Sequence, residues 1–214
     1  MPSVPRLWPG ATVAILASGP SLTREDVEFV RGKVPVIAIN ATYALAPWAD
    51  VMYGADAKVF RWYWKKGPAG FEDLPLRACS SLKYSLTKGA EVYGNVTILR
   101  RGQREGLSLN PAILNTGDNS GYQAINFAVL AGASRILLLG YDMQKGPAGE
   151  EHWHADHPNH SRSPYQKFRV HFNGMIEPLK AAGVEVVNCS PRTALTCFPR
   201  MPLRKALAPI EAVA

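Results

Sequence analysis

The chain has 214 residues, of which 47% are hydrophobic and 19% charged, and this composition supports a folded core and excludes a disordered chain. No stretch approaches the roughly 20 apolar residues of a membrane span, and we expect a cytoplasmic protein without a signal peptide or a membrane partner. The net charge of +7 favours an anionic ligand, and without an arginine-rich arm or a nucleic-acid module we expect a small phosphate-bearing molecule rather than nucleic acid.

Apolar runs that are continuous rather than alternating mark the first half of the chain, as expected of strands buried on both faces. The first run ends in Gly19-Pro20-Ser21, and Ser21 or Thr23 then caps a predicted helix. The second run ends at Asn40 and the third at Asp56. The strands predicted in this half cover 12–18, 34–40, 50–56 and 96–101.

The second half alternates helices and strands more regularly. Asn119 or Ser120 opens an amphipathic helix that Gly132 stops, and the most hydrophobic strand of the chain follows and ends at Asp142. The predicted elements are a helix over 119–133, a strand over 135–142, a histidine-rich lid loop over about 143–163, a helix over 163–183, a strand over 184–190 and a proline-rich tail.

Strands that alternate with helices predict a mostly parallel sheet with helices on both faces. With no linker or internal repeat, we expect residues 1–214 to form one α/β domain of Rossmann-like type. In such sheets the ligand crevice lies outside the carboxyl ends of the strands. The small polar residues predicted to reach that rim are Gly19, Pro20, Ser21, Asn40, Asp56, Asn119, Ser120, Gly121, Asp142 and Ser190.

Two glycine-containing loops precede predicted helices and favour an anionic ligand. Gly19 permits close approach of backbone to ligand, and the helix after it directs N–H groups at the same place. The segment 115–125 (NTGDNSGYQAI) is a second loop of this kind. Neither is a dinucleotide fingerprint or a P-loop. Together the two loops predict a nucleotide or nucleotide-sugar between them.

The motifs GPSL, AIN, NSGYQA, LLGYD and NCSP resemble, in this order, those of small Rossmann-like bacterial sialyltransferases that use CMP-sialic acid. They also resemble the archaeal-type 6-hydroxymethylpterin pyrophosphokinase family. The set NSGYQA, LLGYDM, HWH-x-DHP and NCS is similar to uncharacterised bacteriophage and prophage proteins, whose location is the host cytoplasm. The resemblance spans roughly residues 12–200.

The sialyltransferase resemblance implies a nucleotide site and a group-transfer reaction. The residues matching its pattern are Gly19, Pro20 and Ser21 near the phosphates, Asn40 after the second strand, Ser120 and Gly121 beside the donor, and Ser190 and Pro191 in the C-terminal loop. This chain has Ser18 where those enzymes carry an asparagine. Their catalytic histidine falls near Gln166, which His160 and His171 flank.

Residues 152–160 (HWHADHPNH) carry the densest group of metal-ligand side chains. The spacing of His152, His154, Asp156 and His157 is the ligand pattern of metallo-β-lactamase-like hydrolases, but that fold needs further ligands well downstream. Because the only later histidines are His160 and His171, we exclude that fold. Metal binding, substrate contact and a purely structural loop all stay open for this segment.

Three functions follow from these patterns. The first is glycosyl transfer from a nucleotide-sugar, with His152, His154 or His157 as general base and Asp142 also in a catalytic place. The second is metal-dependent pyrophosphoryl transfer or phosphoester hydrolysis, in which Zn, Mn or Mg ions are held by the histidine loop with Asp156 or by Asp56 and Asp142. The third is a non-catalytic phage protein that binds a nucleotide or nucleic acid.

Overall fold

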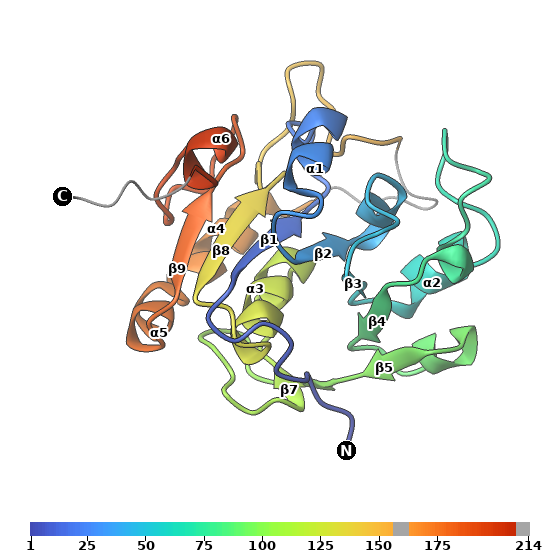
Figure 1. Cartoon of the computed structure of the whole chain (residues 1–214), viewed down its shortest axis with the longest axis horizontal. Coiled ribbons are helices and arrows are strands. Elements are labelled where there is room, and N and C mark those ends of the chain that lie inside the picture. The colour runs from blue at the N-terminus through green and yellow to red at the C-terminus, as the bar shows by residue number, and fades with distance from the viewer. Residues whose placement is uncertain (156–162, 209–214) are drawn as a thin grey trace.

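The computed structural model describes residues 1–155 and 163–208 of the chain (Figure 1). The strands are β1 (Thr12–Leu16), β2 (Val36–Ile39), β3 (Val51–Tyr53), β4 (Leu82–Ser85), β5 (Val96–Ile98), β6 (Arg100–Arg101), β7 (Ile113–Leu114), β8 (Arg135–Leu139) and β9 (Glu185–Asn188). Strands β1, β2, β3, β5, β8 and β9 fall within predicted apolar runs, whereas β4 and β7 were not predicted.

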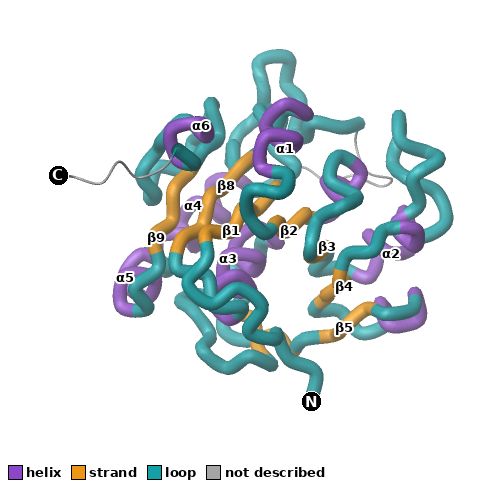
Figure 2. Tube along the Cα trace, viewed as in Figure 1, coloured by secondary structure: helices purple, strands orange, loops and turns teal. Residues whose placement is uncertain are grey.

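The helices pack on the two faces of the sheet that these strands form (Figure 2). They are α1 (Arg24–Val30), α2 (Ala57–Tyr63), α3 (Ser120–Leu130), α4 (Tyr165–Asn173), α5 (Ile176–Ala181) and α6 (Leu203–Ala206), with 3-10 turns η1 (Asn40–Ala44), η2 (Leu76–Ala78) and η3 (Ala90–Tyr93). The N-cap of α1 is Thr23, whose side chain accepts a hydrogen bond from the Asp26 N–H, so the second of the two predicted caps is the one used.

Within the described residues, seven strands form one sheet in the order β5-β4-β3-β2-β1-β8-β9, and every neighbouring pair is parallel. Strands β6 and β7 form a separate parallel pair. The chain moves outward from β1 to β5 on one side and returns through β8 to β9 on the other. The strand order therefore reverses between β1 and β8, where a crevice opens in doubly wound sheets.

Each face of the sheet has its own core. On β1, Val13 and Ile15 face the cluster formed with α3, α4 and α5. Ala14 and Leu16 face the opposite cluster, formed with α1, η1, α2 and α6. Successive side chains of a strand point to opposite faces, so the continuous apolar run is explained by burial on both sides. The predicted Rossmann-like α/β fold is confirmed.

Three predicted elements are wrong in detail. The strand predicted over 96–101 is divided at Leu99, and its second part pairs with β7 instead of joining the main sheet. The helix predicted over 163–183 ends at Asn173 and restarts at Ile176, because Gly174 occupies the C-cap position of α4. The proline-rich tail contains a short helix, α6.

Figure 1 shows β8 and β9 pointing to the end of the sheet where the loop after β8 lies. The loops that follow β1 and β2 begin at this same end, since all these strands are parallel. Among residues 1–155 and 163–208, no helix combines the length and the apolar character needed to cross a bilayer.

Candidate functional site

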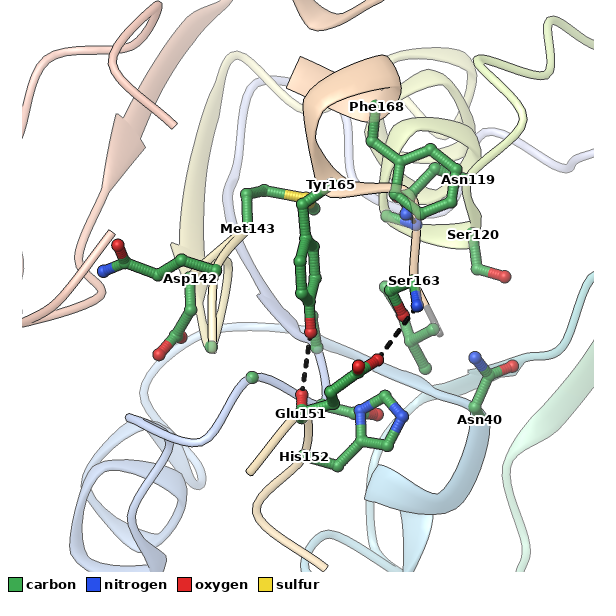
Figure 3. Close-up of a pocket in the computed structure, with 17 residues that line it drawn as sticks. Asn40, Asn119, Ser120, Asp142, Met143, Glu151, His152, Ser163, Tyr165 and Phe168 are labelled. Carbon is green, nitrogen blue, oxygen red and sulfur yellow. Dashed lines mark hydrogen bonds between the residues drawn. The ribbon is translucent and has the colours of Figure 1, made fainter. Parts of the chain in front are cut away.

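A cavity opens at the reversal of the strand order, outside the carboxyl ends of β1, β2 and β8 (Figure 3). Its walls come from these three strand ends, from the start of α3 and from both described flanks of the histidine-rich loop. The lining residues are Ala17, Ser18, Gly19, Ile39, Asn40, Asn119, Ser120, Gly121, Gly140, Asp142, Met143, Gln144, Glu151, His152, Ser163, Tyr165 and Phe168.

The loop after β1 is held against the end of β8. The Gly19 N–H donates to the Gly140 carbonyl at 2.9 Å, and a Cβ at Gly19 would lie 2.3 Å from that carbonyl oxygen and from Oδ1 of Asp142. Ser21 donates twice to Asp142, from its backbone N–H at 3.0 Å and from its hydroxyl at 2.7 Å. Glycine is therefore required at position 19 by close packing of two loops, and Asp142 anchors both.

The Asp142 side chain is 3% exposed. Burial raises the pKa of its carboxyl group, while the hydrogen bonds from Ser21 and the charge of Arg192 partly offset that rise. Its oxygens already accept two hydrogen bonds from Ser21, so the geometry favours a loop-anchoring role for this residue. Pro20 and Ser21 are not among the lining residues of the cavity, and Ser21 contributes through Asp142.

Asn40 has two unusual features at the end of β2. Its φ of 52° lies in the left-handed region, which is strained for a residue other than glycine. Asn40 lines the cavity, and its Oδ1 atom is buried and has no hydrogen-bond partner among the described residues. A strained backbone with an unsatisfied buried acceptor is the pattern of a ligand contact.

The start of α3 forms part of the wall of the same cavity. Oδ1 of Asn119 caps the helix and accepts from the N–H groups of Gly121 and Tyr122, at 2.8 and 3.2 Å. The Gly121 carbonyl accepts from the hydroxyl of the buried Tyr141 at 3.0 Å, and a Cβ at Gly121 would lie 2.8 Å from the Tyr141 ring. With Ser120 also in the cavity wall, the positive end of an 11-residue helix faces the ligand space.

A cluster of charged side chains surrounds Asp118, in the turn that precedes α3. The Asp118 carboxylate lies 2.9 Å from Nζ of Lys167 and 3.3 Å from Nε of Arg104. Nε2 of the buried His171 lies 3.8 Å from the same carboxylate, and its Nδ1 lies 3.1 Å from Oε1 of Glu105. The cluster connects α4 to the turn that precedes α3.

Replacing Asp118 by asparagine is expected to make the free energy of unfolding less dependent on pH in the acid range. The hydrogen bond from Lys167, followed by the charge of Arg104, lowers the pKa of Asp118 below its ordinary 3.8. Its contribution, about 0.5–1 kcal/mol for a partly exposed network, is complete above pH 3.8 and is lost as pH falls through the lower folded-state value. Urea unfolding of both proteins should show a difference at pH 7 that disappears toward pH 2; a difference independent of pH contradicts this account.

The histidine-rich loop is fixed at its two described ends by Glu151. Oε2 of Glu151 accepts from the Ser163 N–H at 3.0 Å, its Oε1 pairs with Lys145 at 3.3 Å, and its carbonyl accepts from the Tyr165 hydroxyl at 3.3 Å. Figure 3 shows the first and last of these bonds below the Tyr165 ring. Burial and then the charge of Glu151 raise the pKa of Tyr165 to about 12, so this phenol remains a donor at neutral pH.

His152 lines the cavity, and its ring stacks on that of His154 with centroids 5.0 Å apart and planes at 15°. His154 itself is not among the lining residues. The predicted Asp156 and His157 lie outside the described residues. Of the two predicted loop ligands that the structure describes, His152 and His154, it thus brings His152 to the cavity.

Two predicted rim residues lie away from this cavity. Asp56 precedes α2 and pairs with Lys58 at 3.7 Å, so the described structure does not bring it together with Asp142. Ser190 lines a second cavity, between β9 and α6, and its hydroxyl accepts from the Tyr141 N–H at 2.8 Å. Among residues 1–155 and 163–208 no group of three or more His, Cys, Asp or Glu side chains is arranged to hold a metal ion.

Sequence reasoning assigned no binding place to several lining residues. These are Met143, Gln144, Glu151, Ser163, Tyr165 and Phe168. Met143 has a φ of 49° directly after Asp142, a backbone feature that no residue pattern announces. Ser163 and Tyr165 are held at the cavity by their hydrogen bonds to Glu151, which close the base of a loop and which residue types alone do not indicate.

No family model matches the chain, and no curated protein matches it. Among solved structures, the chain is similar to the sialyltransferase CstII from Campylobacter jejuni in complex with a substrate analogue, cytidine-5'-monophosphate. The TM-score is 0.55 over 90% of this chain and 85% of that chain, with 13% sequence identity. This similarity shows a shared Rossmann-like fold of the kind seen in a glycosyltransferase, at the level of fold alone. The pyrophosphokinase and phage resemblances stay predictions.

Proposed function

We propose that this chain is a glycosyltransferase that binds a nucleotide-sugar in the cavity at the ends of β1, β2 and β8. The observation that carries the proposal is Asn40, a cavity-lining residue with a strained backbone whose buried Oδ1 has no hydrogen-bond partner among the described residues. An acceptor in this state calls for a donor on a ligand, such as a ribose hydroxyl or a base amino group. The shared fold with a sialyltransferase supports the same reading.

The phosphate of the donor is proposed to lie at the start of α3. Ser120, the first residue of this helix, lines the cavity and offers its hydroxyl, and the helix dipole favours an anion there, while the N–H of Gly121 already donates to the helix cap. Of the two described carboxylates that line the cavity, Asp142 keeps its charge while its oxygens accept from Ser21, whereas the charge of Glu151 is offset by Lys145, which favours an anion. The overall charge of +7 acts in the same direction.

The reaction breaks the bond between the sugar carbon and the phosphate oxygen, and the nucleotide leaves with the electron pair. A hydroxyl oxygen of the acceptor forms the new bond to the same carbon, and its proton passes to His152, which lines the cavity. Donors at the start of α3 stabilise the negative charge on the departing phosphate. His152, Asn40, Ser120 and Gly121 are thus the residues that we propose for the reaction.

Cytidine nucleotides are the first ligands to test, because the similar sialyltransferase was solved with cytidine-5'-monophosphate. Calorimetric titration of the purified protein with CMP, UMP, AMP and inorganic phosphate should show CMP binding that exceeds phosphate binding at least tenfold. Release of CMP from CMP-sialic acid, with and without sugar acceptors, then tests transfer. Absence of binding by every nucleotide in this panel would overturn the proposed function.

Asn40→Gly should separate stability from binding. Glycine adopts a φ of 52° without strain, so the free energy of unfolding should stay constant or rise. CMP affinity should fall about threefold to tenfold, the value of one net hydrogen bond. Calorimetry and thermal unfolding on the same samples measure both quantities. Equal CMP affinity in the two proteins would remove Asn40 from the site.

A further inference from the structure

Trp153 separates His152 and His154 in the sequence and is hydrogen-bonded to the segments that follow two strands. Its backbone N–H donates to the Ser18 carbonyl at 3.0 Å, at the end of β1. Its indole Nε1–H donates to Oγ1 of Thr42 at 3.1 Å, in η1 after β2. Oγ1 of Thr42 also lies 3.1 Å from Oγ of Ser18. One residue thus joins the histidine loop to both loops that border the cavity, through its backbone to Ser18 and through its side chain to Thr42.

The Trp153 ring is held from its other side by packing. It meets Phe71 edge to face, with centroids 5.7 Å apart and planes at 89°. The guanidinium of Arg24, in α1, lies 5.5 Å from the centroid of Phe71. Edge-to-face pairs of this kind favour one orientation over others. The ring also meets that of His154 edge to face, with centroids 4.9 Å apart and planes at 79°, so Trp153 is fixed by two hydrogen bonds and two directed ring contacts.

The positions of the neighbouring imidazoles depend on Trp153. His152 precedes it directly and lines the cavity, while His154 follows it and stacks on His152 at 5.0 Å. A backbone fixed at Trp153 leaves His152 little freedom beyond its own side-chain rotations. Thr42 is fully buried, so its hydroxyl is a fixed point of attachment.

We propose that Trp153 is a positioning residue that sets the place of the His152 imidazole against the cavity. The hydrogen bond from Trp153 Nε1 to Thr42 Oγ1 is the contact that orients the indole ring of Trp153. The inference rests on the proposed function in one respect, since it gives His152 the general-base role. Its geometric part, the placement of His152 by Trp153 and Thr42, stands on the described contacts alone.

The test compares variants that lose the indole contact with variants that keep it. Trp153→Phe keeps an aromatic ring beside Phe71 but removes the N–H donor, and Thr42→Val removes the acceptor at nearly constant volume. Thr42→Ser restores a hydroxyl at that position. Trp48→Phe is the matched control, because Nε1 of Trp48 has no hydrogen-bond partner among the described residues.

The readout is the nuclear Overhauser contact between the rings of His152 and His154 in histidine-labelled protein without ligand, assigned with His152→Gln and His154→Gln. We expect the contact in the wild type, in Thr42→Ser and in Trp48→Phe, and its loss in Trp153→Phe and Thr42→Val. In the same two variants kcat should fall about fivefold, the effect of one ordinary hydrogen bond, with the CMP dissociation constant within twofold.

The outcomes separate the two proposals. If the ring contact persists in Trp153→Phe and Thr42→Val, the positioning role is wrong, whatever the turnover. A purely structural role would lower the melting temperature and leave the ring contact of the folded protein intact, which also contradicts the inference. If the wild type binds no nucleotide, the proposed function fails, and the ring contact still decides the role of Trp153.

Discussion

Gly19→Ala is expected to abolish CMP binding and to lower the free energy of unfolding by about 1–3 kcal/mol, the usual cost of overpacking. The added Cβ would lie 2.3 Å from the Gly140 carbonyl oxygen and 2.3 Å from Oδ1 of Asp142. Neither atom can retreat easily, because the carbonyl accepts the Gly19 N–H and the carboxylate holds Ser21. The loop after β1 must then move away from β8, and the cavity between them changes shape.

Gly146→Ala is the matched control for this change. Its Cβ would meet the exposed side chain of Glu150, which can rotate away, so neither stability nor CMP binding should change measurably. Calorimetry and urea unfolding of both variants measure the two quantities. Wild-type CMP affinity in a folded Gly19→Ala protein would show that the contact between the β1 and β8 loops does not shape the site.

The sheet could be predicted because its strands are buried on both faces. The runs 12–18, 34–40 and 135–142 are continuously apolar, and no exposed helix has that pattern. The second half of 96–101 was different, because Arg100 and Arg101 are exposed and pair with β7 instead of extending β5. A pattern of local hydrophobicity does not contain the choice of partner strand.

The site could be predicted where residues directly follow strands. Gly19 and Asn40 reach the cavity because parallel strands end at one edge, and Ser120 reaches it because α3 starts there. Ser190 follows β9 by the same rule, yet its hydroxyl accepts from the Tyr141 N–H and it lines a different cavity. Such a local hydrogen bond depends on tertiary register and cannot be read from residue types.

The motif His152-Trp153-His154 shows a second limit of pattern reading. Its histidines suggested metal ligation by their spacing, and the tryptophan between them carried no weight in that argument. In the structure Trp153 makes the contacts that hold the segment, to Ser18 and Thr42. The indole N–H of Trp153 donates to Thr42, 111 residues earlier in the sequence. A local motif does not indicate so distant a partner.

His152→Ala is expected to lower kcat about 10²-fold to 10⁴-fold, the usual contribution of a positioned general base. CMP affinity should change little, because the proposed nucleotide contacts come from Asn40 and the start of α3. A protonated imidazole cannot accept a proton, so the decrease in kcat/KM toward acid pH that a histidine base produces should be present in the wild type and absent in the variant.

His154→Ala serves as the comparison for His152→Ala, since His154 stacks on His152 but does not line the cavity. Loss of the stacked ring leaves the His152 imidazole in place but less restrained. We therefore expect a much smaller decrease in kcat than in His152→Ala. Equal losses in the two variants would indicate that the histidines act as one unit, through a shared ligand or ion. Unchanged turnover in His152→Ala would show that His152 is not the general base. The CMP affinity of that variant would still show whether the cavity binds the nucleotide.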